Sequence, residues 1–352
     1  MAKAKTNPIR LGLVGLGRAG WGMHCAELKG KERLFQFVAA CDPAAERRDL
    51  MARTYPGCKT YERLEDLLAD PAVEMIDIAT RSCDHFPQAL QAMKTDKDIF
   101  LEKPICETYE EARKILAASK KAKGTLYIRH NRRCETAFLH IREIMAAGLL
   151  GDVAVVKLAR HSFNRRDDWQ TLAKFGGGQL LNWGPHIVDH SLRMLDAPVE
   201  SLWSDTKRVV AAGDAEDTLK LVFRGTNGRI VDMEISTAAA IPSPEYHILG
   251  SRGSLTCTGD DIKVKYIDPK AKLTARKANA GDPGTTFGSP EKLKWVEKSF
   301  KAKPKNAWNI WDELYSAVRQ GTRFPITVEE AVEVMRVVST VKAGKRFVQF
   351  AK

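Results

Sequence analysis

The stretch that decides the fold is Ile9-Arg10-Leu11-Gly12-Leu13-Val14-Gly15-Leu16-Gly17-Arg18-Ala19-Gly20. Its first half is a short apolar run of the kind that forms a buried β-strand. A helical segment follows to about Gly30, and a second apolar run, Phe35 to Cys41, completes a strand–helix–strand unit. The sequence therefore predicts that the chain begins with a parallel β-sheet.

The spacing of the three glycines is typical of a loop that binds the pyrophosphate of a dinucleotide. The first glycine permits a tight turn, the second lets backbone N–H groups approach the phosphates, and the third allows close packing of helix on strand. The helix N-terminus adds positive potential. We favour this interpretation over a purely structural turn. It assigns cofactor binding to Gly15, Leu16, Gly17, Arg18, Ala19 and Gly20.

Asp42 ends the second strand, 22 residues beyond Gly20. A carboxylate at this position accepts hydrogen bonds from a ribose diol and repels a 2′-phosphate, which favours NAD over NADP. Arg47 and Arg48 follow closely and could compensate a phosphate, so NADP stays open.

The alternation of strand and helix continues to about residue 127. Apolar or amphipathic runs succeed one another at Leu64–Ala69, Val73–Thr80, Phe86–Met93, Ile99–Leu101, Tyr109–Lys121 and Thr125–Ile128. This pattern predicts a doubly wound parallel sheet, with a ligand at the carboxyl ends of its strands. Those ends are Gly15, Asp42, Thr80 and Glu102. We expect residues 1–127 to form a dinucleotide-binding domain.

Glu102-Lys103-Pro104 follows a buried strand at this same edge. A surface turn with a solvated ion pair explains such a tripeptide equally well. If Lys103 instead lies beside the positive charge of a nicotinamide, its pKa falls and it becomes a proton partner.

A second polar stretch, Gly178 to His190, follows three consecutive glycines. Asn182 and His186 are four residues apart, so on one helix they would share a face. We take His186 as a candidate proton carrier, although a lone histidine on a helix is more often structural. The run from His186 to His190 partly resembles a zinc-binding pattern, but its acid is the shorter aspartate and its glycine context differs. We therefore expect no metal.

The second half, residues 128–352, alternates differently. The runs Val153–Leu158, Leu219–Phe223 and Ile230–Ile235 are separated by short turns, with Gly225-Thr226-Asn227-Gly228 as a hairpin turn. Such turns favour antiparallel pairing. We expect a second domain here that binds substrate and forms oligomer contacts.

Composition narrows the class of protein. The net charge is +12, and residues 263–305 hold 12 Lys/Arg against 4 Asp/Glu. A solvated basic surface explains this better than a nucleic-acid site, and attraction of an anionic substrate stays open. The seven cysteines form no Cys-x-x-Cys pair, which favours a reducing compartment. With no apolar run of about 18 residues and no signal-peptide pattern, we expect a cytoplasmic protein without a membrane span.

Taken in order, the motifs resemble those of the glucose–fructose oxidoreductase / inositol dehydrogenase / rhizopine catabolism (Gfo/Idh/MocA) family. The resemblance runs from Ile9 to about Val338. It rests on Gly15-x-Gly17-x-x-Gly20, Asp42, Thr80 with His85, Glu102-Lys103-Pro104, and Gly177-Gly178 leading to Asn182-x-Gly184-x-His186-x-x-Asp189. It implies an N-terminal Rossmann domain and a C-terminal α/β domain with a large, open, mostly antiparallel sheet.

The resemblance also implies roles for single residues. His186 matches the catalytic histidine, and Lys103 lies beside nicotinamide and substrate, with a cis bond before Pro104. Arg132 approaches the active site, and Arg47 covers the adenine. Cofactor binding extends to Thr80, His85, Glu102 and Lys103, although helix-end packing explains His85 at least as well.

One position departs from the family pattern. Many relatives carry aspartate where this chain has Asn182. An amide cannot take up a proton, so we expect Asn182 to orient the histidine or a substrate hydroxyl. The remaining substrate-binding candidates lie before the glycine triplet. They are Arg165, Asp168 and Trp169, together with Lys103, Arg132, Asn182 and His186.

The implied activity is hydride transfer between nicotinamide and a hydroxyl of a sugar, sugar derivative or cyclic polyol. Two alternatives stay open: NAD-dependent glycoside hydrolysis through transient oxidation and elimination, and a non-enzymatic sugar or NAD sensor. By resemblance we also expect a homo-oligomer, a dimer or tetramer, that forms through the C-terminal sheet.

Overall fold

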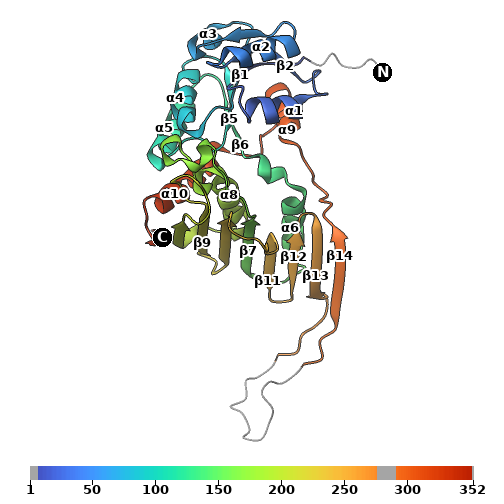
Figure 1. Cartoon of the computed structure of the whole chain (residues 1–352). Coiled ribbons are helices and arrows are strands. Elements are labelled where there is room, and N and C mark those ends of the chain that lie inside the picture. The colour runs from blue at the N-terminus through green and yellow to red at the C-terminus, as the bar shows by residue number, and fades with distance from the viewer. Residues whose placement is uncertain (1–6, 276–290, 351–352) are drawn as a thin grey trace, which may run out of the picture.

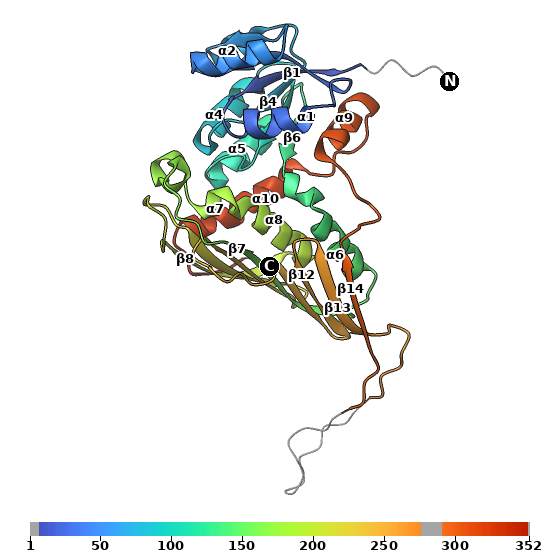
Figure 2. The same cartoon turned by 45° about the vertical axis from the view of Figure 1, so that its right-hand side comes forward.

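A computed structural model of the chain describes residues 7–275 and 291–350. It contains a six-stranded sheet and a nine-stranded sheet. Figures 1 and 2 show the first sheet, with the N-terminal helices, stacked on the helices that cover one face of the second. Residues 276–290, the middle of the basic 263–305 segment, lie outside the described residues.

The first sheet is parallel throughout, with the strand order β3-β2-β1-β4-β5-β6. This confirms the predicted doubly wound arrangement. Because the order runs outward from β1 in both directions, the carboxyl ends of β1 and β4 diverge at a switch point, where such sheets bind ligands. The strands are β1 (Ile9–Val14), β2 (Phe35–Cys41), β3 (Lys59–Tyr61), β4 (Met75–Ile78), β5 (Asp98–Glu102) and β6 (Leu126–Arg129).

The helices of this domain differ from the prediction at three points, the first of which is α2 (Ala45–Thr54), in a stretch where no helix was expected. After the glycine loop the chain forms a π-helix, η1 (Gly20–Cys25), and then the short α1 (Ala26–Leu28), where we expected one helix. Helix α4 begins at Ser82, whereas the prediction began at Phe86. Pro87, which lies inside the helix, disfavoured a helical turn before it in the prediction. The remaining helices are α2 (Ala45–Thr54), α3 (Leu64–Ala69), α4 (Ser82–Ala92) and α5 (Tyr109–Ser119).

The second sheet has the order β14-β13-β12-β11-β7-β10-β9-β8-β15. Every pair is antiparallel except β7 with β10. The predicted hairpin turn joins β9 to β10, with Gly228 at φ +81°. The strands are β7 (Val153–His161), β8 (Val199–Lys207), β9 (Thr218–Gly225), β10 (Ile230–Ser236), β11 (Tyr246–Gly250), β12 (Gly253–Thr258), β13 (Asp261–Ile267), β14 (Trp295–Lys301) and β15 (Phe347–Gln349).

Helices join the two sheets. Helix α8 packs on β7, β9 and β10, and α10 packs on both α8 and α5. Helix α9, although late in the chain, returns to the first sheet, where Trp311 is fully buried against Phe35 and Phe100. These helices are η2 (Asn131–Cys134), α6 (Thr136–Ala146), η3 (Trp169–Thr171), η4 (Ala173–Phe175), α7 (Gln179–Asn182), α8 (Gly184–Leu195), α9 (Ile310–Gln320) and α10 (Val328–Lys342).

Two further findings concern the ranges 7–275 and 291–350. No helix there combines the length and the apolar character needed to cross a bilayer. All seven cysteines fall within these ranges, and each is a free thiol.

Candidate active site

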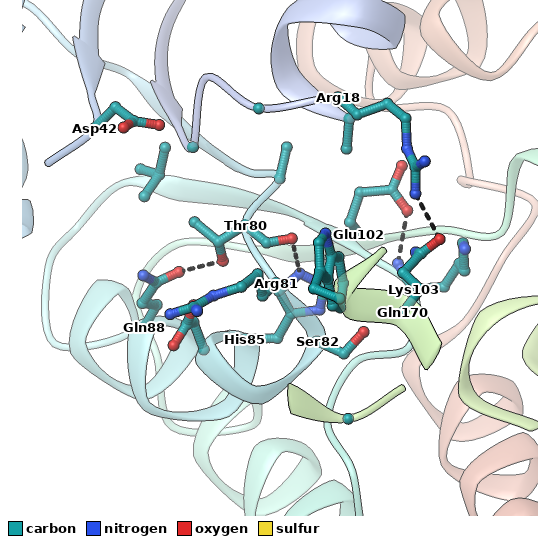
Figure 3. A pocket seen from close by; sticks show the side chains of 18 of the residues that line it. Arg18, Asp42, Thr80, Arg81, Ser82, His85, Gln88, Glu102, Lys103 and Gln170 are labelled. Carbon is teal, nitrogen blue, oxygen red and sulfur yellow. Dashed lines mark hydrogen bonds and ion pairs between the residues drawn. The ribbon is translucent and has the colours of Figure 1, made fainter. Parts of the chain in front are cut away.

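A cleft of about 750 Å³ opens at the carboxyl ends of the first sheet. The nucleotide domain forms one wall, and the segment 169–182 of the second domain forms the other (Figure 3). The cleft gathers most of the predicted cofactor residues and part of the predicted substrate set. The predicted residues that line it are Gly15, Gly17, Arg18, Ala19, Asp42, Arg47, Thr80, His85, Glu102, Lys103, Trp169 and Asn182.

The glycine loop has the geometry of a phosphate cradle. Gly15 adopts φ +92°, a conformation that side-chain-bearing residues rarely take. A Cβ placed on Gly20 would lie 1.9 Å from the carbonyl oxygen of Gly15, so only glycine allows this helix to approach the strand. A Cβ on Gly17 would meet only Arg47 Nη1, at 3.9 Å, so space remains beside this backbone. The loop therefore fits a pyrophosphate.

Asp42 fastens this loop to the end of β2. Its carboxylate is only 3% exposed and accepts hydrogen bonds from the N–H groups of Leu16 (2.8 Å) and Ala44 (3.0 Å). Arg47 Nη1 lies 3.3 Å from the same carboxylate and lines the cleft. Leu16 and Gly20 do not line the cleft, so they shape the loop from behind.

His85 connects the ends of β4 and β5. Its Nδ1 lies 2.6 Å from the carbonyl oxygen of Pro104, and its Nε2 lies 3.3 Å from that of Thr80. Burial lowers the pKa of His85, which keeps the ring neutral. The Lys103–Pro104 peptide is cis, as the resemblance implied. The neutral ring carries one N–H, so His85 donates to one of these two carbonyl oxygens while it lines the cleft.

Lys103 projects across the cleft toward the second domain. Its ammonium group donates to the backbone oxygen of Asn182 at 3.2 Å. Burial lowers the pKa of Lys103; Glu102 opposes that shift, while Arg129 and Arg132 add to it. The lysine is therefore easier to deprotonate than one in water.

Glu102 lies beneath Lys103 in a buried ionic network. Its Oε1 accepts from Arg129 (2.5 Å) and from His24 Nε2 (3.1 Å), and its Oε2 accepts from the Lys103 N–H (2.9 Å). His24 Nδ1 lies 2.8 Å from Asp77. Burial favours the neutral acid, but Arg129 and His24 outweigh it and hold the pKa of Glu102 well below its usual range. A fixed anion therefore supports the turn that carries Lys103.

Asn182 and His186 belong to two successive helices, α7 and α8, rather than to the one helix on which they would share a face. Asn182 ends α7, and Pro185 stands in the first turn of α8. Asn182 lines the cleft, whereas His186 is 5% exposed and is absent from the residues that line it. Within the described ranges, no hydrogen bond joins the two side chains. The amide of Asn182 instead faces that of Gln170, at 3.4 and 3.5 Å.

His186 is a neutral, buried imidazole. Its ring lies 5.8 Å from the Trp183 ring and 6.4 Å from the His130 ring, and its Nδ1 is buried without a hydrogen-bond partner. Burial, and then the charge of Lys103, lower the pKa of His186 well below its ordinary value of 6.5. An imidazole in this state can accept a proton.

The residues that follow His186 serve the structure. Asp189 forms a two-pronged ion pair with Arg133, at 2.5 and 2.7 Å. His190 Nε2 lies 2.9 Å from the Arg132 carbonyl oxygen, and its Nδ1 lies 3.3 Å from the Tyr246 hydroxyl. In the described part of the chain, no three His, Cys, Asp or Glu side chains are arranged to hold a metal ion.

Four predicted substrate residues lie outside the lining of the cleft. These are Arg132, Arg165, Asp168 and His186. Arg165 is exposed to solvent. Asp168 is bound by Arg166 at 2.6 and 2.9 Å. Arg132 stacks over Trp183, 5.0 Å from the ring centre, and lines a separate polar cavity of about 490 Å³.

Several residues that line the cleft escaped the prediction. Gln170 lies directly after Trp169, and Gln88 accepts a hydrogen bond from the Thr80 hydroxyl at 2.7 Å. Arg81 and Ser82 lie just beyond the end of β4. Arg81 and Ser82 directly follow Thr80, a predicted cofactor residue, and this position could have identified them. The sequence around Gln170 contains no motif that would have done so.

Two family models match the chain. One, described as the oxidoreductase family with an NAD-binding Rossmann fold, covers residues 9–130, and the other, the GFO/IDH/MocA C-terminal domain, covers residues 138–256. The chain belongs to the Gfo/Idh/MocA oxidoreductase family. The Gfo/Idh/MocA assignment confirms the resemblance seen in the sequence and makes the first domain an NAD-binding Rossmann domain.

Similar Gfo/Idh/MocA proteins align over nearly the whole chain. "Uncharacterized oxidoreductase YdgJ" of Escherichia coli (strain K12) is 24% identical over 94% of both chains. "scyllo-inositol 2-dehydrogenase (NADP(+)) IolW" of Bacillus subtilis (strain 168) is 22% identical over 96% of this chain and 93% of its own. A crystal structure of an NAD-binding protein from Listeria innocua has the same fold, with a TM-score of 0.85, 24% identity, and coverage of 98% of this chain and 100% of that one.

Proposed function

We propose that the protein is a dehydrogenase that transfers a hydride between NAD(P) and a hydroxyl-bearing carbon of a sugar, sugar derivative or cyclic polyol. The observation that carries the proposal is the joint presence of Lys103, Trp169 and Asn182 in the cleft that contains the glycine loop. The inositol substrate in the name of the Bacillus subtilis relative supports the same substrate class.

The glycine loop and Asp42 would hold the dinucleotide. The backbone N–H groups beside Gly17 would contact the pyrophosphate, and Arg47 would lie against the adenosine. The carboxylate of Asp42 favours NAD. Arg47, 3.3 Å from that carboxylate, would supply the positive charge that a 2′-phosphate of NADP requires. The cofactor, when bound, supplies the hydride acceptor or donor.

The protein residues would manage the proton and the hydroxyl. His186 is neutral, so it can take the hydroxyl proton during oxidation. Lys103 would bind the hydroxyl oxygen through its ammonium group, and Asn182 would orient the neighbouring part of the substrate with its amide. Glu102 acts as a fixed anion that keeps Lys103 in place.

Trp169 offers a ring face to the C–H side of a sugar, and it lines the cleft beside Asn182. Arg132, Arg165 and Asp168 remain predicted contacts at the margin of the site. The positive charges of the two arginines suit an acidic or phosphorylated sugar.

We also propose a cytoplasmic homo-oligomer. Figures 1 and 2 show helices over one face of the second sheet, while the opposite face carries no helix of the described chain. That open face is the surface expected to meet a second copy.

The test is a panel of free sugars, inositols and aryl glycosides, each incubated with NAD⁺ or NADP⁺. We expect reduced nicotinamide to accumulate with at least one free sugar or inositol. Release of the aglycone without such accumulation would support the hydrolytic alternative. If the protein binds NADH yet turns over no member of the panel, the dehydrogenase proposal is wrong.

A further inference from the structure

Gln170 occupies the junction between the two walls of the cleft. It lies in the turn η3, lines the cleft, and points toward Arg18 in Figure 3. Its backbone is fixed as well, since its carbonyl oxygen accepts the N–H of Gly178 at 2.8 Å and its N–H donates to Asp168 at 3.0 Å. Gln170 has no part in the proposed proton or hydride transfer.

The side chain of Gln170 has a defined orientation. Arg18 Nη2 and Arg166 Nη2 each donate to its Oε1, both at 2.5 Å. Guanidinium groups only donate hydrogen bonds, so the atom that faces them must be the amide oxygen. The amide nitrogen of Gln170 is then left to face Asn182.

This orientation fixes the next amide in turn. Gln170 Nε2 lies 3.5 Å from Asn182 Oδ1, and Asn182 Nδ2 lies 3.4 Å from Gln170 Oε1. The Asn182 amide oxygen accepts from Gln170 Nε2, and the Asn182 amide nitrogen turns one N–H toward a Gln170 oxygen that Arg18 and Arg166 already share. One N–H and one lone pair of Asn182 remain for a ligand, which suits a hydroxyl that both donates and accepts.

The other end of this chain of contacts belongs to the cofactor loop. Arg18 lies between Gly17 and Gly20, and it also approaches Asp168 Oδ2 at 3.4 Å. Its side chain is 63% exposed, so few other contacts hold it. A pyrophosphate held by the loop would fix the loop backbone and with it Arg18.

We propose that Gln170 is a positioning residue that couples cofactor binding at the glycine loop to substrate binding at Asn182. The proposal rests on the proposed function. A dinucleotide fixes Arg18, Arg18 fixes the Gln170 amide, and Gln170 orients Asn182 for a hydroxyl. Because both ligands stabilise the same arrangement, each increases the affinity for the other by the same factor.

The test measures the Kd of NADH by fluorescence, with and without the inositol or sugar that the panel identifies. In the wild type we expect that compound to tighten NADH binding about fivefold or more. In Gln170→Met the factor falls to about 1. Gln170→Glu keeps the acceptor for both arginines but loses the donor to Asn182, so it also loses the coupling while it still binds NADH.

Gln88→Met is the matched control, since Gln88 lines the same cleft and contacts Thr80 rather than Arg18 or Asn182. It should keep the wild-type factor. The same factor in Gln170→Met as in the wild type, no coupling in the wild type, or an equal loss in Gln88→Met would each overturn the proposal.

A second measurement needs no substrate, so it separates this proposal from the proposed function. If no panel member binds, the Kd of NADH is measured for Arg18→Met, Gln170→Met and the double variant. We expect strong non-additivity, with the double variant no weaker than Arg18→Met, because both changes break the same link. Additive effects would overturn the coupling on the cofactor side.

Discussion

His186 enters the proposed reaction as a buried base whose ring lies close to those of Trp183 and His130. Its position outside the lining of the cleft means that a substrate must reach it past Asn182 and Lys103. What fits His186 for proton transfer is therefore its neutral protonation state. That state follows from its burial and from the nearby positive charge of Lys103, which together lower the pKa of the ring.

Replacing His186 by glutamine should lower kcat/KM about 10²–10⁴-fold, because a positioned general base is lost. The Kd of NADH should stay close to that of the wild type. His140→Gln, on α6 outside the cleft, is the control and should retain full activity. An unchanged kcat/KM in His186→Gln would remove His186 from the mechanism.

The pH profile of oxidation should reflect His186 and Lys103. The pKa of His186 lies well below 6.5, so kcat/KM should stay level from neutral pH to well below pH 6.5 and fall only as the ring is protonated. The pKa of Lys103 lies below 10.5, so the alkaline fall should begin below that value. Initial rates of the wild type and His186→Gln across this range provide the check. An acid limb that persists in His186→Gln would belong to another group.

Two elements shape the site: the glycine loop with η1, and the broken helix α7–α8. The loop was predictable because its glycines meet steric demands that are local in sequence. The break at Trp183 was not, because the four-residue spacing of Asn182 and His186 fits a continuous helix equally well. Contacts of α7 with the segment 169–171 decide how Asn182 faces the cleft.

Alanine substitutions in the loop should separate folding from binding. Gly20→Ala places a Cβ 1.9 Å from the Gly15 oxygen, so we expect a loss of about 1–3 kcal/mol in unfolding free energy, with NADH affinity reduced as well. Gly17→Ala meets no close atom, so it should fold normally yet bind NADH at least about tenfold more weakly, since the Cβ would crowd the phosphate. Urea unfolding and NADH titration measure the two effects. Equal stability losses in both variants would contradict this division.

At the scale of the whole molecule, a buried ionic cluster connects the first sheet to α9. His24, Asp77, Glu102 and Arg129 come from η1, β4, β5 and β6, and the His24 ring lies 5.4 Å from that of Trp311 on α9. Burial alone lowers the pKa of His24, and Arg129 adds to this, but the charge of Asp77 and the hydrogen bonds to Asp77 and Glu102 reverse it and leave the pKa raised. Such a cluster is stable only when complete.

Stability should therefore depend on pH through His24. A raised pKa in the folded state means that the contribution of His24 is fully present below pH 6.5 and is lost as pH rises through the folded pKa. His24→Gln should cost about 3–5 kcal/mol at low pH, and its deficit against the wild type should shrink as pH increases. Urea unfolding of both proteins at several pH values tests this. A deficit that does not change with pH would contradict a charged His24.

The sequence by itself determined the parallel sheet, the glycine loop, Asp42 and Lys103 at one edge, and the antiparallel character of the second half. These features can be read from short stretches of sequence: apolar runs mark the strands, glycine spacing marks the loop, and Asp42 and Lys103 directly follow strands. Only the tertiary structure decided the return of α9 to the first sheet, the burial of His186 outside the cleft, and the contacts of Gln170 with Arg18 and Asn182. Arg18 and Gln170 are 152 residues apart in the sequence. Their hydrogen bond could not be predicted from local patterns, because only the packing of the two domains brings the two residues together.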